Sequence, residues 1–479
     1  MAQSRKEATV PPETRTSAAF WLLLLTATFV LCREFVGLGA AFASGAALAL
    51  SWWLVRKTTA PFNFRRITIT SFWYLTYLAM IFLPAFFVFA DQEGPFRARY
   101  LFAVHTVLVT VPLGWLLAKW FCRLREGENE RYFSGVIADT ARRKRTKSAY
   151  WVLLIPSLVL MILYIRSVGT IPLFFLLRHP GDYMQVALLR EDSFKLLDSP
   201  YAYAFALVRS VVFPLLVMVS FGFYLQSRSK TWRNLFIGTL AAALFYCSLS
   251  VAKAPVAAIV AMLGFFIYYY RQGLIGKKGL AVILIAVLLF PLAVIWLAYA
   301  GVPTKGAFYA ISDRLFYVPS EVVYYYFEVF PHWHGFLYGR SIDKLARLMG
   351  MVPFDTANYV GLYAIPTGLE SISANAAFIA DLYADFGMPG VLVGGVVAGF
   401  VMQWFHIHAI RQKKTVVAIA LYSFLTFSFW FLNSSSLPII LASNGAIVAL
   451  VISWWLDKRV SSIGGRPFIQ DFNQLSDQA

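Results

Sequence analysis

Apolar stretches that suit the thickness of a lipid bilayer recur from one end of the 479-residue chain to the other. A helix needs about 20 mainly apolar residues to cross the hydrocarbon core of a membrane. The expected spans lie at about residues 18–32, 35–55, 67–90, 101–121, 150–165, 205–226, 234–250, 255–270, 279–300, 388–409, 415–432 and 437–456. The chain is 59% hydrophobic and only 14% charged, whereas soluble proteins usually carry about 25% charged residues. We therefore predict an all-α, polytopic integral membrane protein with about 12 transmembrane helices, and we exclude a soluble enzyme and a disordered chain.

Basic residues are concentrated in alternate connections between these expected spans. The connections contain the basic residues of segments 56–66, 123–147, 228–233, 271–278, 411–414 and 458–459, and each falls on the side of the N-terminus. Loops that stay in the cytoplasm accumulate Lys and Arg, so both termini are predicted to be cytoplasmic. The formal net charge of +18 then points to the anionic surface of a bilayer as the partner, and not to nucleic acid.

Two long connections lie on the opposite, external side, at residues 166–204 and 301–387. We treat residues 1–479 as a single transmembrane domain that carries these two loops, because loops of this length usually carry function. In the first loop, the apolar segment Gly169–Leu177 is too short to span a bilayer and predicts a re-entrant or interfacial helix. The second loop is expected to contain amphipathic helices.

Six basic residues are candidates for binding an anionic group, and the arginines among them present a planar fork that grips phosphate oxygens. They are Arg178 and Arg190 in the first loop, Arg209 and Lys253 within or between apolar runs, and Arg314 and Arg340 in the second loop. A cation at membrane depth usually faces a protein interior or a water-filled cavity. The alternatives are that the loop arginines contact lipid headgroups and that Arg209 reaches the membrane interface.

The second loop combines titratable and aromatic residues of the kinds that act on sugars. Candidate catalytic residues are His332, His334, Glu321 and Asp381, together with Asp182 of the first loop, because imidazole and carboxylate groups orient or deprotonate a hydroxyl group. Candidate sugar-stacking residues are Tyr324, Tyr325 and Trp333. Packing of this aromatic loop on lipid headgroups is the alternative. Asp381 and Asp385 lie one helical turn apart and form either a cap network or a base.

The segment before the tenth expected span ends in Gly387-Met-Pro389-Gly390. These residues predict a break where the chain bends into the membrane. Further glycines follow at positions 394, 395 and 399, and their spacing allows another helix to approach closely. At the other end of this span lie His406 and His408, for which we expect anchoring at the cytoplasmic interface.

Several catalytic motifs are absent from the sequence. His332 and His334 have no third histidine or cysteine pair nearby, so no metal site is expected. There is no Gly-rich phosphate loop and no nucleophile elbow, so ATP-driven transport and serine hydrolysis find no support. The three cysteines are expected to be small buried hydrophobes.

Three segments together resemble the bacterial oligosaccharide repeat unit polymerases, the O-antigen polymerase (Wzy-type) family. They are the turn Gly169-Thr-Ile-Pro-Leu with its following arginine, the segment Ser248-Leu-Ser-Val-Ala-Lys253-Ala-Pro, and the segment from Asn375 to Gly390. The phrase His334-Gly-Phe-Leu-Tyr-Gly339 also fits the family. With span count and loop order, the similarity extends over roughly residues 150–455.

The resemblance implies a glycosyltransferase of the bacterial inner membrane with a GT-C-like arrangement, acting in O-antigen, capsule or exopolysaccharide synthesis. Such enzymes transfer a growing glycan from one undecaprenyl diphosphate to the sugar end of another lipid-linked repeat unit, with no cofactor and no metal. The basic residues named above would hold the diphosphate, and a histidine or carboxylate would activate the acceptor hydroxyl. A chain-length regulator protein is a further candidate partner.

Two alternatives stay open. An O-antigen ligase-like transferase shares the architecture and differs in its acceptor. A polysaccharide-related transporter or flippase would carry polar residues through the middle of several spans. Most spans here are nearly free of charge, and the ionisable residues gather in the two external loops. This distribution favours the enzyme.

Overall fold

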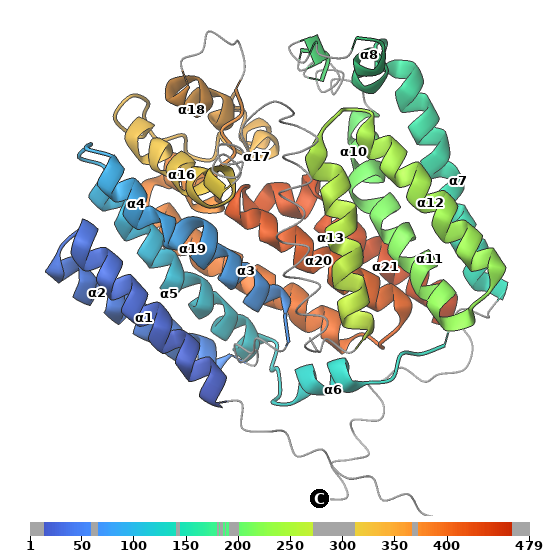
Figure 1. Cartoon of the computed structure of the whole chain (residues 1–479), viewed down its shortest axis with the longest axis horizontal. Coiled ribbons are helices and arrows are strands. Elements are labelled where there is room, and N and C mark those ends of the chain that lie inside the picture. The colour runs from blue at the N-terminus through green and yellow to red at the C-terminus, as the bar shows by residue number, and fades with distance from the viewer. Residues whose placement is uncertain are drawn as a thin grey trace, which may run out of the picture. The chain divides into compact units, whose positions relative to one another are not determined.

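Every regular secondary-structure element in the described part of the chain is helical. The structure is a computed structural model, and it describes residues 14–58, 66–139, 144–179, 182, 185–186, 188–190, 201–271, 312–365 and 372–461. Within these ranges the helices, labelled as in Figure 1, are α1 (Thr14–Phe35), α2 (Leu38–Lys57), α3 (Ile69–Tyr77), η1 (Leu78–Phe82), α4 (Pro84–Asp91), α5 (Arg97–Phe121), α6 (Glu128–Ser134), α7 (Lys144–Ser167), α8 (Pro172–Arg178), α10 (Ala202–Leu207), η3 (Val208–Val212), α11 (Phe213–Ser227), α12 (Lys230–Ser248), α13 (Lys253–Tyr270), η4 (Asp313–Tyr317), α16 (Val318–Val329), α17 (Asp343–Leu348), α18 (Thr356–Ala364), α19 (Phe378–Arg411), α20 (Val416–Trp430), η5 (Phe431–Asn433), η6 (Ile439–Ser443) and α21 (Ala446–Ser461). The elements η1, η3, η4 and η6 are π-helical turns.

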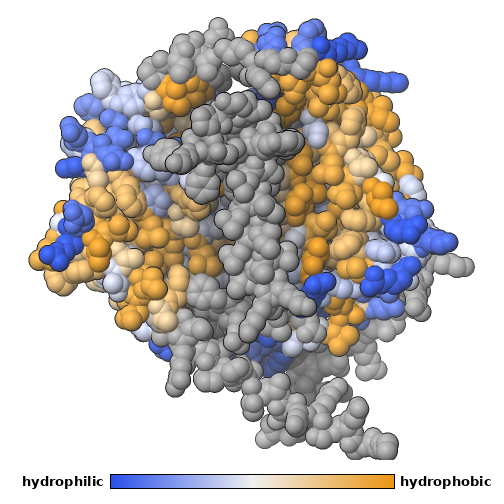
Figure 2. Space-filling view, viewed as in Figure 1, coloured by the Kyte–Doolittle hydropathy of each residue, from blue (hydrophilic) through white to orange (hydrophobic). Residues whose placement is uncertain are grey.

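Eight segments of the described residues are long and apolar enough to cross a membrane, judged by length and composition. They are Leu38–Lys57, Ile69–Asp91, Arg97–Phe121, Thr146–Ser167, Ala202–Ser227, Phe378–Arg411, Val416–Asn433 and Ile439–Arg459. Figure 2 shows that hydrophobic residues cover much of the described surface on the face in view, as expected for helices surrounded by lipid. These segments confirm a helical, multi-pass membrane architecture.

The remaining four predicted spans are not among these eight segments. Helices α1 and α12 lie at the first and seventh predicted spans, and Ala254–Tyr270 of α13 is a shorter apolar helix at the eighth. The ninth predicted span, at residues 279–300, lies outside the described residues. The count of twelve spans, and the sidedness of the loops, stay predictions.

The chain divides into two compact units. Unit 1 comprises Met1–Arg125 and Ile275–Trp404, and unit 2 comprises Glu126–Leu274 and Phe405–Ala479. In unit 1, α2 packs against α1 and α5, and α16 packs against η1, α4 and α5. In unit 2, α11 packs against α12, α13 and α20, while α21 packs against α20 and α7. Each unit contains candidate spans, so both belong to the membrane-spanning part of the chain.

Glycines bring α5 and α19 into close contact in unit 1. A Cβ atom at Gly399 would lie 2.1 Å from the backbone oxygen of Val111, and one at Gly395 would lie 2.2 Å from Oγ1 of Thr110. The reverse contact exists as well, because a Cβ atom at Gly114 would meet the backbone of α19. The close helix approach predicted from the glycine spacing is therefore confirmed.

Helix α19 is interrupted at Gly387, where the backbone has φ 65° and ψ −154°. This backbone conformation is available to glycine and strained for other residues. The predicted break is thus present, but the helix extends back to Phe378, so the residues just before the break form the first turns of α19. The sequence alone did not show this continuity, because Gly387 and Pro389 both act as helix-ending signals.

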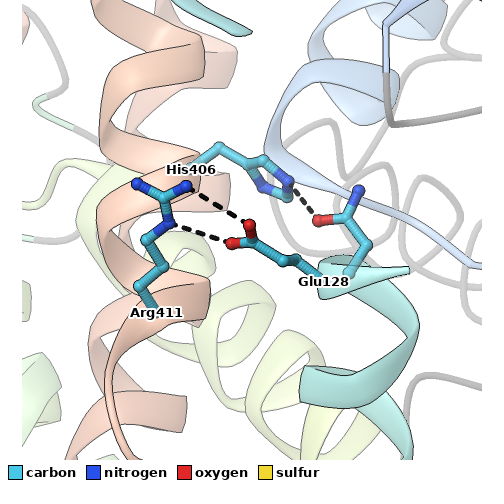
Figure 3. Close-up of polar contacts among 4 residues, drawn as sticks. Glu128, His406 and Arg411 are labelled. Carbon is cyan, nitrogen blue, oxygen red and sulfur yellow. Dashed lines mark hydrogen bonds and ion pairs between the residues drawn. The ribbon is translucent and has the colours of Figure 1, made fainter. Parts of the chain in front are cut away.

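The prediction that His406 anchors its span at the cytoplasmic interface is wrong. His406 of unit 2 is fully buried, and both ring nitrogens are hydrogen-bonded: Nε2 lies 2.9 Å from Oδ1 of Asn129, and Nδ1 lies 2.9 Å from Oη of Tyr422. Nearby, the guanidinium group of Arg411 donates from Nε to Glu128 at 2.9 Å (Figure 3). His406 therefore anchors the short helix α6 to α19 within the protein, rather than anchoring the span at the membrane interface.

The contacts of α6 predict an unequal effect of two substitutions on stability. Asn129→Ala leaves a ring nitrogen of His406 buried without a partner, and we expect the free energy of unfolding to fall by about 1–3 kcal/mol. Arg411→Ala removes an ion pair whose arginine side chain is 41% exposed, so we expect a loss of at most about 1 kcal/mol. Thermal unfolding of the purified variants measures both. Equal losses would contradict the buried hydrogen bond as the main attachment of α6.

Candidate functional site

The loop before α17 is tied to the broken helix α19 by the carboxylate of Asp385, which is 2% exposed. Oδ1 of Asp385 accepts hydrogen bonds from the backbone N–H groups of Gly339, at 3.0 Å, and Ser341, at 3.3 Å. Oδ2 accepts from the hydroxyl of Ser341. The backbone N–H of Tyr338 also donates to the carbonyl of Asp385, at 2.9 Å. Asp385 therefore fixes the conformation of residues 338–341. Of the two roles expected for it, the structure shows the cap network.

Arg340 lies in the loop that Asp385 holds. Its Nε donates to the backbone oxygen of Val352 at 2.9 Å, and its guanidinium carbon lies 5.7 Å from the centre of the Phe354 ring. The backbone N–H of Phe354 donates to the carbonyl of Arg340, at 2.9 Å. The Nη1 and Nη2 groups of this half-buried arginine make no hydrogen bond within the described residues. Its terminal donors are therefore available to an anion.

His334 contacts the same phenyl ring. The imidazole centre lies 4.6 Å from that of Phe354 and 5.7 Å from that of Tyr359. Nδ1 of His334 lies 2.7 Å from the carbonyl oxygen of Gly335. Because a carbonyl only accepts, this contact places the proton of the neutral ring on Nδ1 and leaves the lone pair on Nε2. We call His334, Arg340 and Phe354 the Phe354 cluster.

Helix α16 presents Glu321 beside two other carboxylates. Oε1 of Glu321 accepts from the hydroxyl of Tyr325 at 3.0 Å. Burial raises the pKa of Glu321 above its ordinary value, and the charges of Asp313 and Asp91 raise it further, against the hydrogen bond from Tyr325. Tyr325 is thus engaged by Glu321, and Tyr324 is 1% exposed, so its ring is not open to a sugar in this conformation.

The other candidates of the second loop are more accessible. Trp333 is 61% exposed, and its ring centre lies 6.3 Å from that of Tyr363. His332 is exposed beside Phe96, with ring centres 5.5 Å apart. Arg314 is exposed on η4. Of the three residues expected to stack on sugars, Trp333 offers the largest open ring surface.

Asp381 lies one turn before Asp385 on α19 and has a different environment. It is half-buried and makes no hydrogen bond within the described residues. Burial raises the pKa of Tyr326 on α16, and the charge of Asp381 raises it further. The two aspartates look alike in the sequence but differ in the structure. Asp385 accepts hydrogen bonds from Gly339 and Ser341, whereas Asp381 makes none within the described residues.

The first loop in unit 2 contains the expected short helix, α8. The backbone N–H of Leu173 in its first turn donates to the carbonyl of Leu249 at 3.1 Å, which ties α8 to the turn that precedes α13. The charged candidates of this loop, Arg178, Asp182 and Arg190, are all exposed. Exposed charges of this kind can contact headgroups or substrate.

Arg209 lies in the π-helical turn η3 of unit 2 and lines a cavity of about 160 Å³. Pro255, near the start of α13, lines the same cavity. Arg209 therefore faces a cavity, which is one of the two surroundings expected for it, and its depth in a membrane stays a prediction. Lys253 is the first residue of α13, and its side chain lies outside the described part.

Sequence reasoning missed several residues that the structure brings to these places. Phe354 had no local signal, and neither had Ser428 and Asn444, which line the same cavity as Arg209, because an isolated aromatic or polar residue in an apolar chain is ordinary. The role of Asp385 as the residue that holds Arg340 was visible only as a spacing of one turn from Asp381. Comparisons with family models, with curated proteins and with solved structures find no match to this chain.

Proposed function

We propose that this protein is a glycosyltransferase that polymerises undecaprenyl-diphosphate-linked oligosaccharide repeat units at the periplasmic face of a bacterial inner membrane. The Phe354 cluster carries the proposal, because it holds a guanidinium with open donors and an imidazole against one phenyl ring. The reaction requires these two groups together: a cation for the departing diphosphate and a base for the attacking hydroxyl.

The bonds made and broken follow from these roles. The acceptor sugar hydroxyl attacks the anomeric carbon of the donor glycan and forms a new glycosidic bond. The bond between that carbon and the diphosphate oxygen breaks, and the electron pair leaves with the lipid diphosphate. The Nη1 and Nη2 groups of Arg340 stabilise the negative charge that develops on this leaving group.

His334 accepts the proton of the attacking hydroxyl in this scheme. Its Nδ1 faces the carbonyl oxygen of Gly335, so Nε2 is the nitrogen with a free lone pair. A neutral imidazole with a free lone pair can act as a general base toward a hydroxyl group. Trp333, one residue earlier and largely exposed, is placed to stack on a sugar ring of the acceptor.

The proposal predicts a reaction by the purified protein in the absence of nucleotide sugar. Incubated with the lipid-linked repeat unit and a chelator, it is expected to form the dimer and release undecaprenyl diphosphate, both measured by mass spectrometry. His334→Ala should lower the initial rate by about 100-fold or more, because general base catalysis contributes about 10²–10⁴-fold.

The matched control is His408→Ala, which removes an exposed histidine of α19 in unit 2 and should leave the rate unchanged. A wild-type protein that forms no dimer from the lipid-linked unit would overturn the proposed function. Dimer formation that persists in His334→Ala would leave the reaction in place and remove His334 as its base.

A further inference from the structure

Arg99, in the first turn of α5, is joined to the broken helix α19 by a hydrogen bond. Its Nη1 donates to the hydroxyl of Tyr383 at 3.1 Å. The two residues are 284 positions apart in the chain, and both belong to unit 1. Arg99 is exposed, and within the described residues it makes no ion pair and no other hydrogen bond. The contact with Tyr383 is therefore the one polar contact that this arginine contributes to the described structure.

Tyr383 is a central residue of the segment of α19 that precedes the break at Gly387. Its side chain is 1% exposed. Its ring stacks on that of Phe327 in α16, with centres 3.8 Å apart. It also meets the ring of Phe336 edge-on, with centres 5.9 Å apart. Tyr383 thus contacts α5, α16 and the loop before α17 at once.

The break at Gly387 separates residues 378–386 from the part of α19 that packs closely against α5 through Gly395 and Gly399. Because the backbone at the break is not helical, the regular geometry of the later turns does not set the direction of the first ones. Within the described residues, the bond from Arg99 is the only hydrogen bond that joins α5 to residues 378–386. It therefore holds the first turns of α19 against α5.

The first turns of α19 in turn hold the loop that carries Arg340. The backbone N–H of Leu337 donates to the carbonyl of Ala384 at 2.9 Å, and the carboxylate of Asp385 accepts from three groups of the loop. Both acceptors come from the two residues that follow Tyr383. A shift of Tyr383 relative to α5 is therefore expected to move the loop as well.

Tyr100, the next residue of α5, supports α16 in a similar way. Its hydroxyl lies 2.6 Å from Oγ of Ser320, and its ring centre lies 5.9 Å from that of Phe327. Phe327 is also the ring on which Tyr383 stacks. Helices α5 and α16 pack against each other in unit 1. The first turn of α5 is thus a common support for α16 and for the start of α19.

We propose that Arg99 is a positioning residue of the site: through Tyr383 it holds the first turns of α19, and with them the loop that carries Arg340. The effect on rate rests on the proposed function, whereas the effect on the loop does not. Arg99 acts through Arg340, whose donors are used as charge develops on the leaving group. Removal of Arg99 should therefore lower kcat and leave KM nearly unchanged, because a contact made in the transition state is weakened.

The first experiment measures dimer formation by the full-length protein in nanodiscs. Arg99→Ala and Tyr383→Phe remove the two ends of one hydrogen bond. Each is expected to lower kcat about tenfold, with KM within about twofold of the wild type. The double variant should be no slower than either single variant, because all three lose the same contact. Arg99→Lys keeps a donor for the tyrosine hydroxyl and should recover most of the rate.

Two further variants separate positioning from a general loss of folded protein. In an Arg340→Ala background, Arg99→Ala should slow the reaction no further, because the group that it positions is already gone. A general loss of folded protein would slow both backgrounds equally. Arg33→Ala is the matched control, because it removes an exposed arginine at the end of α1 in unit 1, and it should leave kcat unchanged.

Hydrogen exchange measures the loop itself and does not depend on activity. In Arg99→Ala the backbone N–H groups of Leu337, Gly339 and Ser341 are expected to exchange about tenfold faster, because their acceptors lie in the loosened turns of α19. The N–H groups of α20 should exchange as they do in the wild type. Faster exchange in both places would show a general loss of stability and would refute the positioning role.

Wild-type kcat and wild-type exchange of the loop in both Arg99→Ala and Tyr383→Phe would overturn the inference. If the wild-type protein is active, that result removes Arg99 alone and leaves the proposed function in place. If the wild-type protein forms no dimer but the loop of Arg99→Ala exchanges faster, the proposed function and the effect on rate fall, and the support of the loop by Arg99 remains.

Discussion

Replacing Arg340 by alanine is expected to stop chain extension and leave cells with a single repeat unit in their surface glycan. Arg340 presents Nη1 and Nη2 donors that make no hydrogen bond within the described residues, and the proposed reaction uses them on the departing diphosphate. Removing such a donor from a site of developing charge typically lowers the rate by about 10²–10³-fold. Gel electrophoresis of the surface glycan and the dimer-forming rate of the purified protein both measure the effect.

Arg340→Lys separates charge from geometry. Lysine keeps the positive charge but loses the planar fork and the hydrogen bond from Nε to Val352. We expect a rate between those of the wild type and Arg340→Ala. Arg347→Ala is the matched control, because Arg347 is an exposed arginine of the same loop, paired with Asp343 at 3.0 Å, and its loss should leave glycan length unchanged. A full-length glycan ladder in Arg340→Ala at normal protein abundance would show that Arg340 takes no part.

Removal of the Asp385 carboxylate is expected to displace the loop that carries Arg340 and so to lower the reaction rate. Asp385→Ala strips the acceptors from the N–H groups of Gly339 and Ser341 and from the Ser341 hydroxyl. We expect the free energy of unfolding to fall by about 2–3 kcal/mol. The reaction rate should fall about 100-fold, because a displacement of about 1 Å in a reacting group can cost that much. Thermal unfolding and the dimer-forming rate measure the two effects.

Asp385→Asn distinguishes positioning from proton transfer. The asparagine oxygen still accepts from Gly339 and Ser341, so a positioning role predicts a rate within about tenfold of the wild type. A base would be lost equally in the asparagine and alanine variants. For stability the control is Asp381→Ala, because Asp381 makes no hydrogen bond within the described residues, and its thermal midpoint should stay close to that of the wild type. Equal inactivation by both Asp385 variants would refute the positioning role.

Several features of the fold could be predicted because their signal is local. A run of apolar residues is long enough to cross a membrane wherever it stands, and eight of the expected runs form such helices. Gly387 breaks α19 as expected, since its backbone conformation is one that other residues avoid. Gly395 and Gly399 allow α5 to pack closely against α19, because the absence of a Cβ atom is a property of the residue itself.

The candidate site could not be assembled in this way. Arg340 and His334 stood out as chemically capable residues, but Phe354, the ring that both contact, carries no signal in an aromatic-rich loop. The same limit applied to Tyr324, whose burial depends on packing against Tyr100 from a distant helix. His406 was misinterpreted because its partner Asn129 is 277 residues away in the chain.

The sequence by itself determined that this chain is a helical membrane protein, where its apolar helices lie, and where α19 breaks. These properties depend on apolar length and on the backbone freedom of single residues, which are fixed within about 20 positions. Only the tertiary structure decided that Asp385 holds the loop of Arg340 and that Arg209, Ser428 and Asn444 line one cavity. Such groupings arise from the packing of helices that are distant in the chain, and a polar residue acquires its role from the neighbours that this packing supplies.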